Sequence, residues 1–436
     1  MPVNRDKSFD DLVEHFFGKR IPEGMTASFS MSKLSKEAQE FIVRMLALMK
    51  RAGYTVTAFN PHLIRWLSAT VPSTLPGAWG GRIPPLTLPG RHKKFDTYVA
   101  GLQTGPEHEQ PIFVDVGCGF PPVTSADTAK KLKQWKIYGV DRTFAAYVLY
   151  DENGHYACFD RKGGFQYFQA LMNRSGRAFY ANPEAARNHF QDLFMDLFPL
   201  LERLDETQSE TVEKNRNRLI RDHIRDFETD NLTFIETDFA DLKLPPVHVV
   251  RCMNVLIYFE PETRKKMLEQ IGEFLDENGT VITGTNGLGI QSRYAVYRKV
   301  AGRLSRDAFA FGLDNIGDIV FMPFFTIHEN DPEAMLLADL IGTLRSSRTF
   351  WPEFSKRHDE LLQERGICKR TSDGFLNFEN NEMQTADYLR ENALMWWKIE
   401  EEGFTDMAVN VLVSAGYQAW KNEVGDIAVR PQALDG

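Results

Sequence analysis

The sequence predicts an α/β fold in which a mostly parallel sheet carries helices on both faces. From residue 110 onward, short runs of consecutive apolar residues alternate with segments whose apolar residues recur at helical spacing. The runs expected to form strands are 111–116, 136–140, 232–236, 247–252 and 280–284. Strands that are apolar throughout are covered on both faces, which is typical of a parallel sheet flanked by helices.

Two helical segments support this alternation. Residues 125–135 follow the first strand, with Ser125 as the expected N-cap. Residues 261–275 follow the fourth strand and carry an apolar stripe at helical spacing. Each segment lies where a crossover between two parallel strands needs a helix.

The first 94 residues are expected to form a helical region with a connector to the rest of the chain. Residues 36–52 carry apolar side chains at helical spacing and stop at Gly53, which can take the left-handed conformation that ends a helix. Between residues 72 and 90 prolines and glycines are frequent, which is typical of a connector. We therefore place a domain boundary in this connector, and the N-terminal region with its connector comprises residues 1–94.

Two long segments, 142–230 and 288–400, interrupt the alternation of strands and helices. The first begins with a hairpin that turns at Asn153-Gly154 and continues as helices with aromatic faces. Both segments follow strands that end at the carboxyl edge of the sheet, where open α/β sheets bind ligands. We expect them to form two caps over that edge, above a core of residues 95–287 and 401–436.

Composition and charge narrow the class of protein. The 51 Lys and Arg against 60 Asp and Glu give a net charge of −9, which argues against a nucleic-acid partner. No apolar run approaches the roughly 18 residues that a membrane span needs, and the N-terminus lacks the apolar segment of a signal peptide. The four cysteines form no C-x-x-C pair and the ten histidines show no metal-ligand spacing. These features predict a cytoplasmic enzyme without a metal site, and they leave its oligomeric state open.

A glycine loop follows the first strand, with the sequence Asp115-Val-Gly117-Cys118-Gly119. Glycines let the backbone approach a ligand that a Cβ atom would repel. The amides at the start of the next helix favour a negatively charged group. Cys118 is small enough for such a loop, and Asp115 suits the ammonium group of an amino acid.

An acidic residue at the end of the second strand extends this site. Asp141 lies 22 residues after Gly119, where a carboxylate can accept two hydrogen bonds from a ribose diol. Arg142 follows it as a further candidate. The same geometry serves NAD and S-adenosylmethionine. Asp115, and Pro122 in place of the third glycine of G-x-G-x-x-G, favour S-adenosylmethionine.

The next two strand ends add candidates. After the third strand, Asp238 offers a carboxylate to an adenine amino group and Phe239 offers a ring to cover the base. After the fourth strand come Asn254 and Tyr258, near the middle of the carboxyl edge. Because a polar side chain in such a place needs a partner, Asn254 is a candidate for both the cofactor site and the reaction.

The order of these strand ends resembles that of the class I S-adenosylmethionine-dependent methyltransferases, over about residues 111–286. Residues 252–259 are similar to the C-R-N-V-L-I-Y-F signature of the chemotaxis-receptor glutamate methyltransferases, with Met253 in place of the arginine. We therefore carry over the cofactor site and not the substrate. The resemblance implies a Rossmann-like sheet of seven strands, completed by a C-terminal hairpin, with Tyr258 beside the transferred methyl group.

The resemblance also implies methyl transfer by in-line displacement, for which the protein mainly positions the acceptor. The aromatic content of the two expected caps favours a small apolar or aromatic acceptor, with Tyr258 and Asn254 nearest the reaction. Two alternatives stay open. One is a protein carboxylate (glutamyl) O-methyltransferase, and the other is an NAD-dependent oxidoreductase or a non-catalytic nucleotide-binding protein.

Overall fold

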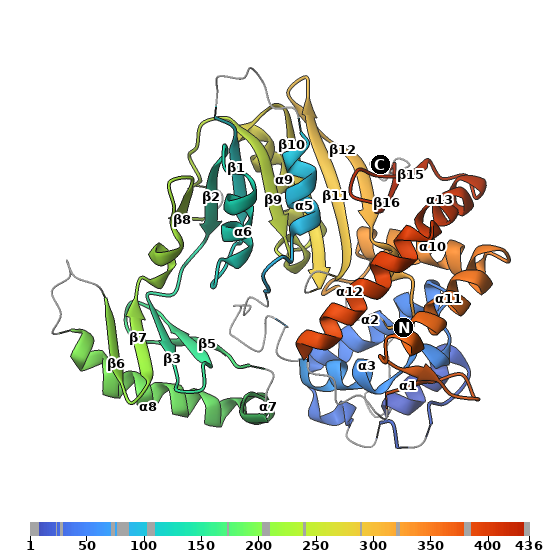
Figure 1. The fold of residues 1–436 in the computed structure, drawn as a ribbon, viewed down its shortest axis with the longest axis horizontal. Helices are drawn as coiled ribbons and strands as arrows, with labels where there is room; N and C mark the ends of the chain where they lie inside the picture. The colour runs from blue at the N-terminus through green and yellow to red at the C-terminus, as the bar shows by residue number, and fades with distance from the viewer. Residues whose placement is uncertain are drawn as a thin grey trace. The chain divides into compact units, whose positions relative to one another are not determined.

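A computed structural model describes most of the chain and divides it into two compact units (Figure 1). The larger unit comprises residues 1–72, 91–104 and 245–436, and the smaller unit comprises residues 73–90 and 105–244. The described residues are 8–22, 24–26, 29–70, 75, 87–102, 110–171, 174–202, 210–238, 241–287, 290–319, 323–378 and 385–430. Most of the expected connector at 72–90 lies outside them.

The smaller unit contains three parallel strands in the order β1 (Ile112–Val116), β2 (Lys136–Asp141) and β8 (Leu232–Glu236). All three coincide with predicted strands. The helix α6 (Val123–Lys131) starts earlier and ends earlier than expected. Its N-cap is Pro122, so the prediction of Ser125 as the N-cap is wrong. Ser125 instead donates a hydrogen bond from its hydroxyl to the Asp115 carboxylate at 2.6 Å.

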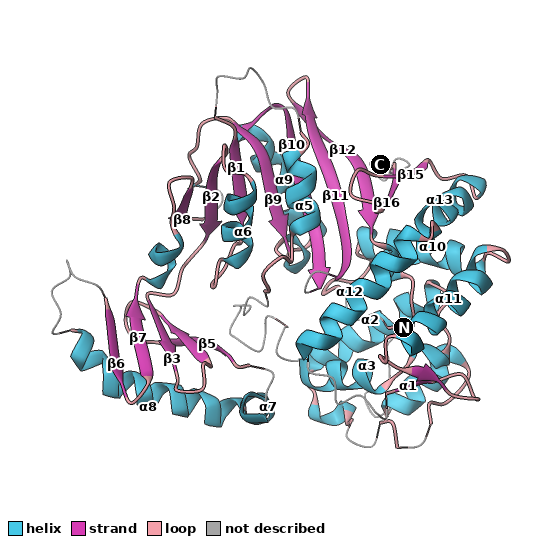
Figure 2. Cartoon of the chain, in the orientation of Figure 1, coloured by secondary structure: helices cyan, strands magenta, loops and turns pink. Residues whose placement is uncertain are grey.

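The smaller unit also contains a five-stranded antiparallel sheet, in the order β5, β4, β3, β7, β6 (Figure 2). Its strands are β3 (Tyr147–Tyr150), β4 (Tyr156–Phe159), β5 (Phe165–Gln169), β6 (Thr211–Lys214) and β7 (Asn217–Arg221). The hairpin expected at Asn153-Gly154 is the one between β3 and β4. Residues 165–169 were expected to be helical, but they form the strand β5 because their aromatic side chains fall on both faces of a pleated segment.

Two helices, α7 (Arg174–Ala181) and α8 (Pro183–Leu201), follow β5 in the chain. The apolar stripe of α8 packs on one face of the five-stranded sheet, and that face is apolar. The buried residues of this core include Leu149, Ala157, Phe159, Phe168, Phe190, Phe194, Leu197 and Leu219. Since strand side chains alternate, the intervening residues of β3 and β4 lie on the opposite face.

The larger unit contains a six-stranded mixed sheet in the order β15, β16, β12, β11, β10, β9. Its strands are β9 (Val247–Met253), β10 (Leu275–Gly287), β11 (Ile290–Val300), β12 (Arg303–Phe311), β15 (Ala419–Lys421) and β16 (Ile427–Val429). Only β9 and β10 pair in parallel, and the other neighbours are antiparallel. The fold is therefore α/β as predicted, but the sheet of the larger unit is mostly antiparallel, whereas the sequence predicted a mostly parallel sheet. The count of seven strands stays a prediction.

The start of the expected second cap belongs to this sheet. Residues 290–311 form β11 and β12, which continue β10 as a meander through a turn at Ala301-Gly302, both with positive φ. The sequence hides these strands because basic and hydroxyl side chains interrupt their apolar residues. Two buried residues of β11, Ser292 and Arg293, show that polar groups of this strand point inward.

The larger unit also contains a two-stranded sheet of β13 (Lys369–Arg370) and β14 (Leu376–Asn377), and a set of helices (Figures 1 and 2). These helices are α1 (Phe9–Phe17), α2 (Lys36–Arg51), α3 (Pro61–Arg65), α5 (Lys93–Ala100), α9 (Pro261–Phe274), α10 (Pro332–Ser346), α11 (Phe350–Glu364), α12 (Thr385–Glu401) and α13 (Phe404–Ser414). The helices expected at 36–52 and 261–275 are α2 and α9. No helix among the described residues has the length and apolar character of a membrane span.

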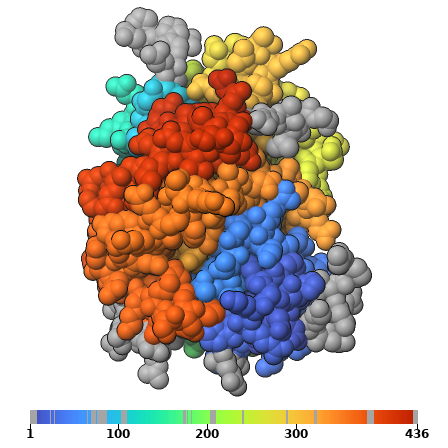
Figure 3. Space-filling model, turned by 90° about the vertical axis from the view of Figure 1, so that its right-hand side faces the viewer, coloured from blue at the N-terminus to red at the C-terminus, as the bar shows by residue number. Residues whose placement is uncertain are grey.

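The N-terminal helices pack against helices from the C-terminal third of the chain (Figure 3). The side chain of Arg51 at the end of α2 bonds the Asp339 carboxylate of α10, with 2.7 Å between one nitrogen and one oxygen. Gly53 follows α2 with a φ of 75°, a left-handed conformation that is typical of the end of a helix. The N-terminal region thus shares one compact unit with residues 332–414.

Candidate functional site

The glycine loop of the smaller unit turns directly after β1. Gly117 and Gly119 have φ of 71° and 63°, a region that favours glycine. The Gly117 amide donates to the carbonyl of Val140 at 2.7 Å, and the Gly119 amide donates to the Asp141 carboxylate at 2.9 Å. The structure therefore joins the loop to the end of β2, and brings together two of the predicted cofactor residues.

Asp141 is held at the carboxyl end of β2. Burial raises the pKa of its carboxyl group, and hydrogen bonds from backbone amides, first that of Gly119, oppose this shift. The Thr237 amide donates to the Asp141 carbonyl at 3.0 Å, so Asp238 follows at the end of the neighbouring strand β8. Arg142 is exposed. Phe239, the predicted cover for the base, lies outside the described residues.

Asp115 and Cys118 point into the protein. Asp115 is 3% exposed and accepts the hydroxyl of Ser125, which ties β1 to the first turn of α6. Burial raises the pKa of the Cys118 thiol well above its usual value, so it is not a nucleophile. A Cβ atom on Gly139 would meet the Cys118 sulfur at 3.2 Å. Any contact of Cys118 with a cofactor is therefore through its backbone.

Asn254 and Tyr258 belong to the larger unit. Asn254 has φ of 58°, and its amide donates to the Gly284 carbonyl at 2.7 Å. Its side-chain oxygen accepts the Asn286 amide at 3.0 Å, so it joins the carboxyl ends of β9 and β10. Tyr258 ends a short 3-10 helix, Leu256–Tyr258, and burial raises the pKa of its hydroxyl group, opposed by the charge of Arg91.

Two further polar residues, Arg91 and Asn286, lie near Tyr258 and Asn254, and the sequence analysis did not predict them. The Arg91 guanidinium donates to the Asn286 side-chain oxygen at 3.3 Å. The Asn286 side-chain nitrogen donates to the Ser292 hydroxyl at 2.6 Å. No motif marks either residue, because Arg91 follows the proline-rich segment and Asn286 ends a strand longer than expected.

A cluster of aromatic residues lies beside the glycine loop, and it was also missed. Phe120 follows Gly119, and its ring centroid is 6.0 Å from that of Tyr156 on β4. The Tyr167 hydroxyl donates to the Phe120 carbonyl at 3.4 Å. Tyr150 lies 5.6 Å from Tyr156, and burial raises the pKa of Tyr150 to about 12. The face of the five-stranded sheet that is opposite α8 therefore contacts the loop. Tyr150 and Tyr156, on either side of the hairpin turn, were the available signal in the sequence.

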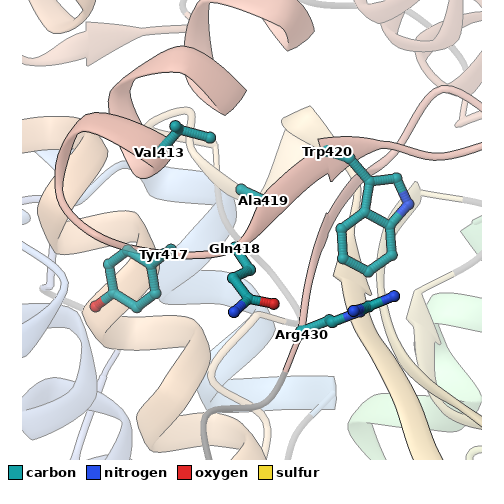
Figure 4. A pocket seen from close by; sticks show the side chains of 6 residues that line it. All are labelled: Val413, Tyr417, Gln418, Ala419, Trp420 and Arg430. Atoms are coloured by element: carbon teal, nitrogen blue, oxygen red, sulfur yellow. The ribbon is translucent and has the colours of Figure 1, made fainter.

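One surface pocket, of about 380 Å³, lies elsewhere in the larger unit (Figure 4). It is lined by Val413, Tyr417, Gln418, Ala419, Trp420 and Arg430, between the end of α13 and the C-terminal hairpin. None of the predicted site residues lines it. Among the described residues no group of three or more His, Cys, Asp or Glu is arranged to hold a metal ion.

Residues 200–298 match the family model described as the S-adenosylmethionine binding domain of the CheR methyltransferases. This range contains β8, β9 and the 252–259 segment that resembles the glutamate methyltransferase signature. The match confirms the resemblance, and it agrees with the predicted enzyme class and cofactor. No curated protein matches the chain.

Solved structures of methyltransferases resemble the chain only weakly. Coclaurine N-methyltransferase has 11% identity and a TM-score of 0.21, and the match covers 45% of this chain and 36% of that one. Magnesium protoporphyrin IX methyltransferase from Synechocystis PCC 6803 has 14% identity and a TM-score of 0.22, with 50% and 77% covered. The chain thus spans about a third of the length of the first of these proteins.

Proposed function

We propose that this protein transfers a methyl group from S-adenosylmethionine to a small acceptor with an aromatic or apolar body. The cofactor half of the proposal is supported by the match to an S-adenosylmethionine binding domain over residues 200–298. One observation supports an aromatic or apolar acceptor: the aromatic residues Phe120, Tyr150 and Tyr156 lie beside the glycine loop.

The residues of the smaller unit fit the cofactor. Two glycines with positive φ form a turn whose backbone a ligand can approach, and a carboxylate fixed by the Gly119 amide stands beside it. In this proposal Gly117 and Gly119 contact the amino-acid part, Asp141 binds the ribose diol and Asp238 binds the adenine. When bound, S-adenosylmethionine supplies an electrophilic methyl group, and the protein has to orient the acceptor and exclude water.

Asn254 and Tyr258 stay proposals for the reaction centre. Asn254 is fixed by hydrogen bonds to the ends of two strands, so its side chain is preorganised. The buried Tyr258 keeps its proton at neutral pH, because burial raises its pKa. In that form its hydroxyl can donate a hydrogen bond to an acceptor atom.

A protein carboxylate is the second candidate acceptor. The match to the CheR methyltransferases favours it, as does the similarity of residues 252–259 to the glutamate methyltransferase signature. Met253 stands where that signature has an arginine, and it is 5% exposed. The arginine's charge is therefore missing from this position, which argues for a different acceptor.

Two measurements test the proposed function. Calorimetric titration is expected to show binding of S-adenosylmethionine and none of NAD. The protein is then incubated with methyl-labelled S-adenosylmethionine and a cell extract, which is separated by size. Label in the small-molecule fraction supports the proposal. Base-labile label in the protein fraction supports the carboxylate alternative, and binding of NAD alone contradicts both.

A further inference from the structure

A histidine paired with an aspartate lies within the aromatic cluster beside the glycine loop. The Nδ1 atom of His223 is 2.7 Å from one Asp226 carboxylate oxygen. Both residues belong to a 3-10 helix, His223–Phe227, which follows β7. The His223 side chain is 15% exposed and that of Asp226 is 61% exposed, so the imidazole is largely enclosed while its partner reaches solvent.

Aromatic rings surround this imidazole. Its centroid is 5.3 Å from the Phe120 ring, 5.9 Å from Tyr150 and 5.5 Å from Phe227. Phe120 directly follows Gly119 in the chain. The loop proposed to hold the cofactor therefore leads into a residue that packs against the His223 ring. The pair and the loop belong to the same unit.

The aspartate determines which nitrogen can act as a base. When Nδ1–H donates to Asp226, the neutral ring carries its free electron pair on Nε2. A carboxylate partner also stabilises the imidazolium that forms when Nε2 accepts a proton. Such a pair is suited to accepting a proton from an acceptor's hydroxyl or amine, and a carboxylate acceptor needs no base because it is already ionised.

We propose that His223 is the general base of the reaction, and that Asp226 orients it. The acceptor is then an aromatic molecule whose nucleophilic atom carries a proton, held beside the His223 imidazole and the Tyr150 ring. The acceptor's O–H or N–H bond breaks, its proton moves to Nε2 and its electron pair forms the bond to the methyl group. The cofactor leaves as a neutral thioether, and the proton passes to solvent. This inference rests on the proposed function and specifies its acceptor.

Charged and titratable side chains from several elements lie around His223. They are Asp226 on the same helix, Tyr150 and Tyr156 on β3 and β4, and Arg218, whose guanidinium lies 5.3 Å over the Tyr150 ring. Burial keeps both tyrosines protonated at neutral pH, since it raises their pKa values.

The first test is binding without reaction. The full chain, with labelled histidines, is saturated with S-adenosylhomocysteine, and 2-naphthol is titrated while imidazole resonances are followed by NMR. 2-Naphthol is expected to shift the His223 resonances. His189 is the matched control, because its Nε2 lies 3.5 Å from Asp151 but its ring packs on Phe190, in the core on the other face of the sheet. Unchanged His223 resonances would overturn the inference.

The second test is turnover. His223→Gln is expected to bind S-adenosylhomocysteine as the wild type does and to methylate 2-naphthol at least a hundredfold more slowly. Asp226→Asn should lower the rate by about tenfold, and His189→Gln should leave it unchanged.

The outcomes separate this inference from the proposed function. A wild type that binds no S-adenosylhomocysteine contradicts both. A wild type that binds the cofactor product and methylates 2-naphthoic acid but not 2-naphthol overturns only the role of His223. Equal turnover of 2-naphthol by the wild type and His223→Gln also overturns the role of His223 and leaves the proposed function standing.

Discussion

Asp141 shapes the glycine loop, and in the proposed function it also binds the cofactor. Its carboxylate accepts the Gly119 amide at 2.9 Å, which sets the conformation of the glycine loop. A carboxylate can accept several hydrogen bonds, so the same group can also bind a ribose diol. Replacing it therefore has two separable effects, one on the fold of the loop and one on the cofactor.

Asp141→Ala is expected to weaken binding of S-adenosylmethionine at least tenfold, because two charge-assisted hydrogen bonds of about 1.5–3 kcal/mol each are lost. Asp141→Asn can still accept the Gly119 amide, so it should keep the wild-type unfolding midpoint yet bind the cofactor more weakly. Calorimetry and urea unfolding measure the two effects. The exposed Asp230→Ala is the control. Wild-type affinity in both Asp141 variants would remove Asp141 from the cofactor site.

Asn254 combines an unusual backbone conformation with a side-chain hydrogen bond. Asn254→Gly keeps the positive φ without strain and loses only the bond to Asn286. Asn254→Ala loses the bond and adds a backbone penalty of about 1 kcal/mol. We therefore expect the free energy of unfolding to fall in both variants, and to fall further in the alanine variant. The same stability in both would mean that the left-handed conformation at residue 254 relaxes.

At the scale of elements, β2 depends on a glycine in its interior. A Cβ atom on Gly139 would lie 2.6 Å from two atoms of the Phe234 ring on β8 and 3.2 Å from the Cys118 sulfur. Because β2 pairs with β1 on one side and β8 on the other, neither neighbour can move away without disturbing a ladder. The glycine permits the Phe234 ring to lie across the strand.

Gly139→Ala is expected to lower the free energy of unfolding by about 1–3 kcal/mol, the usual cost of overpacking a core. Gly101→Ala is the control, since residue 101 has an ordinary φ of −88° and its nearest neighbours would be 3.5 Å away. Urea unfolding followed by circular dichroism measures both variants. A Gly139→Ala variant as stable as the wild type would mean that the Phe234 ring can shift.

The elements that the sequence predicted share a simple pattern. β1, β2, β8 and β9 are short apolar runs, and α2 and α9 have regular apolar stripes, so local composition alone defines them. β11 and β12 were missed because buried polar residues such as Arg293 break the apolar pattern. The Arg293 side chain donates to the Thr285 hydroxyl at 3.1 Å and to the Phe325 carbonyl at 2.8 Å. Such long-range partners cannot be read from spacing.

Some residues of the candidate site were predicted from the sequence, and others were missed. Gly119 and Asp141 were predicted because each lies just after an expected strand. Their hydrogen bond follows from that placement, since the two strands are neighbours. His223 was missed because it belongs to an insertion, where no strand end marks a position. Its neighbour Phe120 lies 103 residues away in the chain, and only the fold brings the two together.

At the scale of the larger unit, five distant segments meet in a partly buried charge cluster. Lys94 of α5 contacts Asp426 at 2.8 Å and Glu400 of α12 at 3.1 Å. Asp426 also accepts the Tyr294 hydroxyl of β11 at 3.0 Å. Asp314 lies nearby, and burial raises the pKa of its carboxyl group to about 7. The cluster therefore holds more acidic groups than the single lysine can neutralise.

The raised pKa of Asp314 gives a pH dependence of stability with a definite sign. Its carboxyl group has a pKa of about 7 in the folded chain and about 3.9 in the unfolded chain. Between these values the folded state binds more protons, so stability is present below pH 4 and declines as the pH rises to 7. Asp314→Asn should remove this decline, on the order of a few kcal/mol.

Urea unfolding of both proteins from pH 4 to pH 8 measures the difference. The exposed Asp387→Asn is the control and should follow the wild-type curve. Parallel curves for the wild type and Asp314→Asn would mean that Asp314 is ionised in the folded protein throughout this range.

The contact between α2 and α10 has a consequence for synthesis of the chain. The apolar side of α2, with Phe41, Met45 and Met49, is buried in the finished unit, yet its partner helix begins only at residue 332. At about 5–20 residues per second, a ribosome needs about 15–60 s to make the residues between them. The smaller unit, complete at residue 244, can fold during that wait. During that time the apolar side of α2 lacks α10, the helix on which it packs in the finished unit.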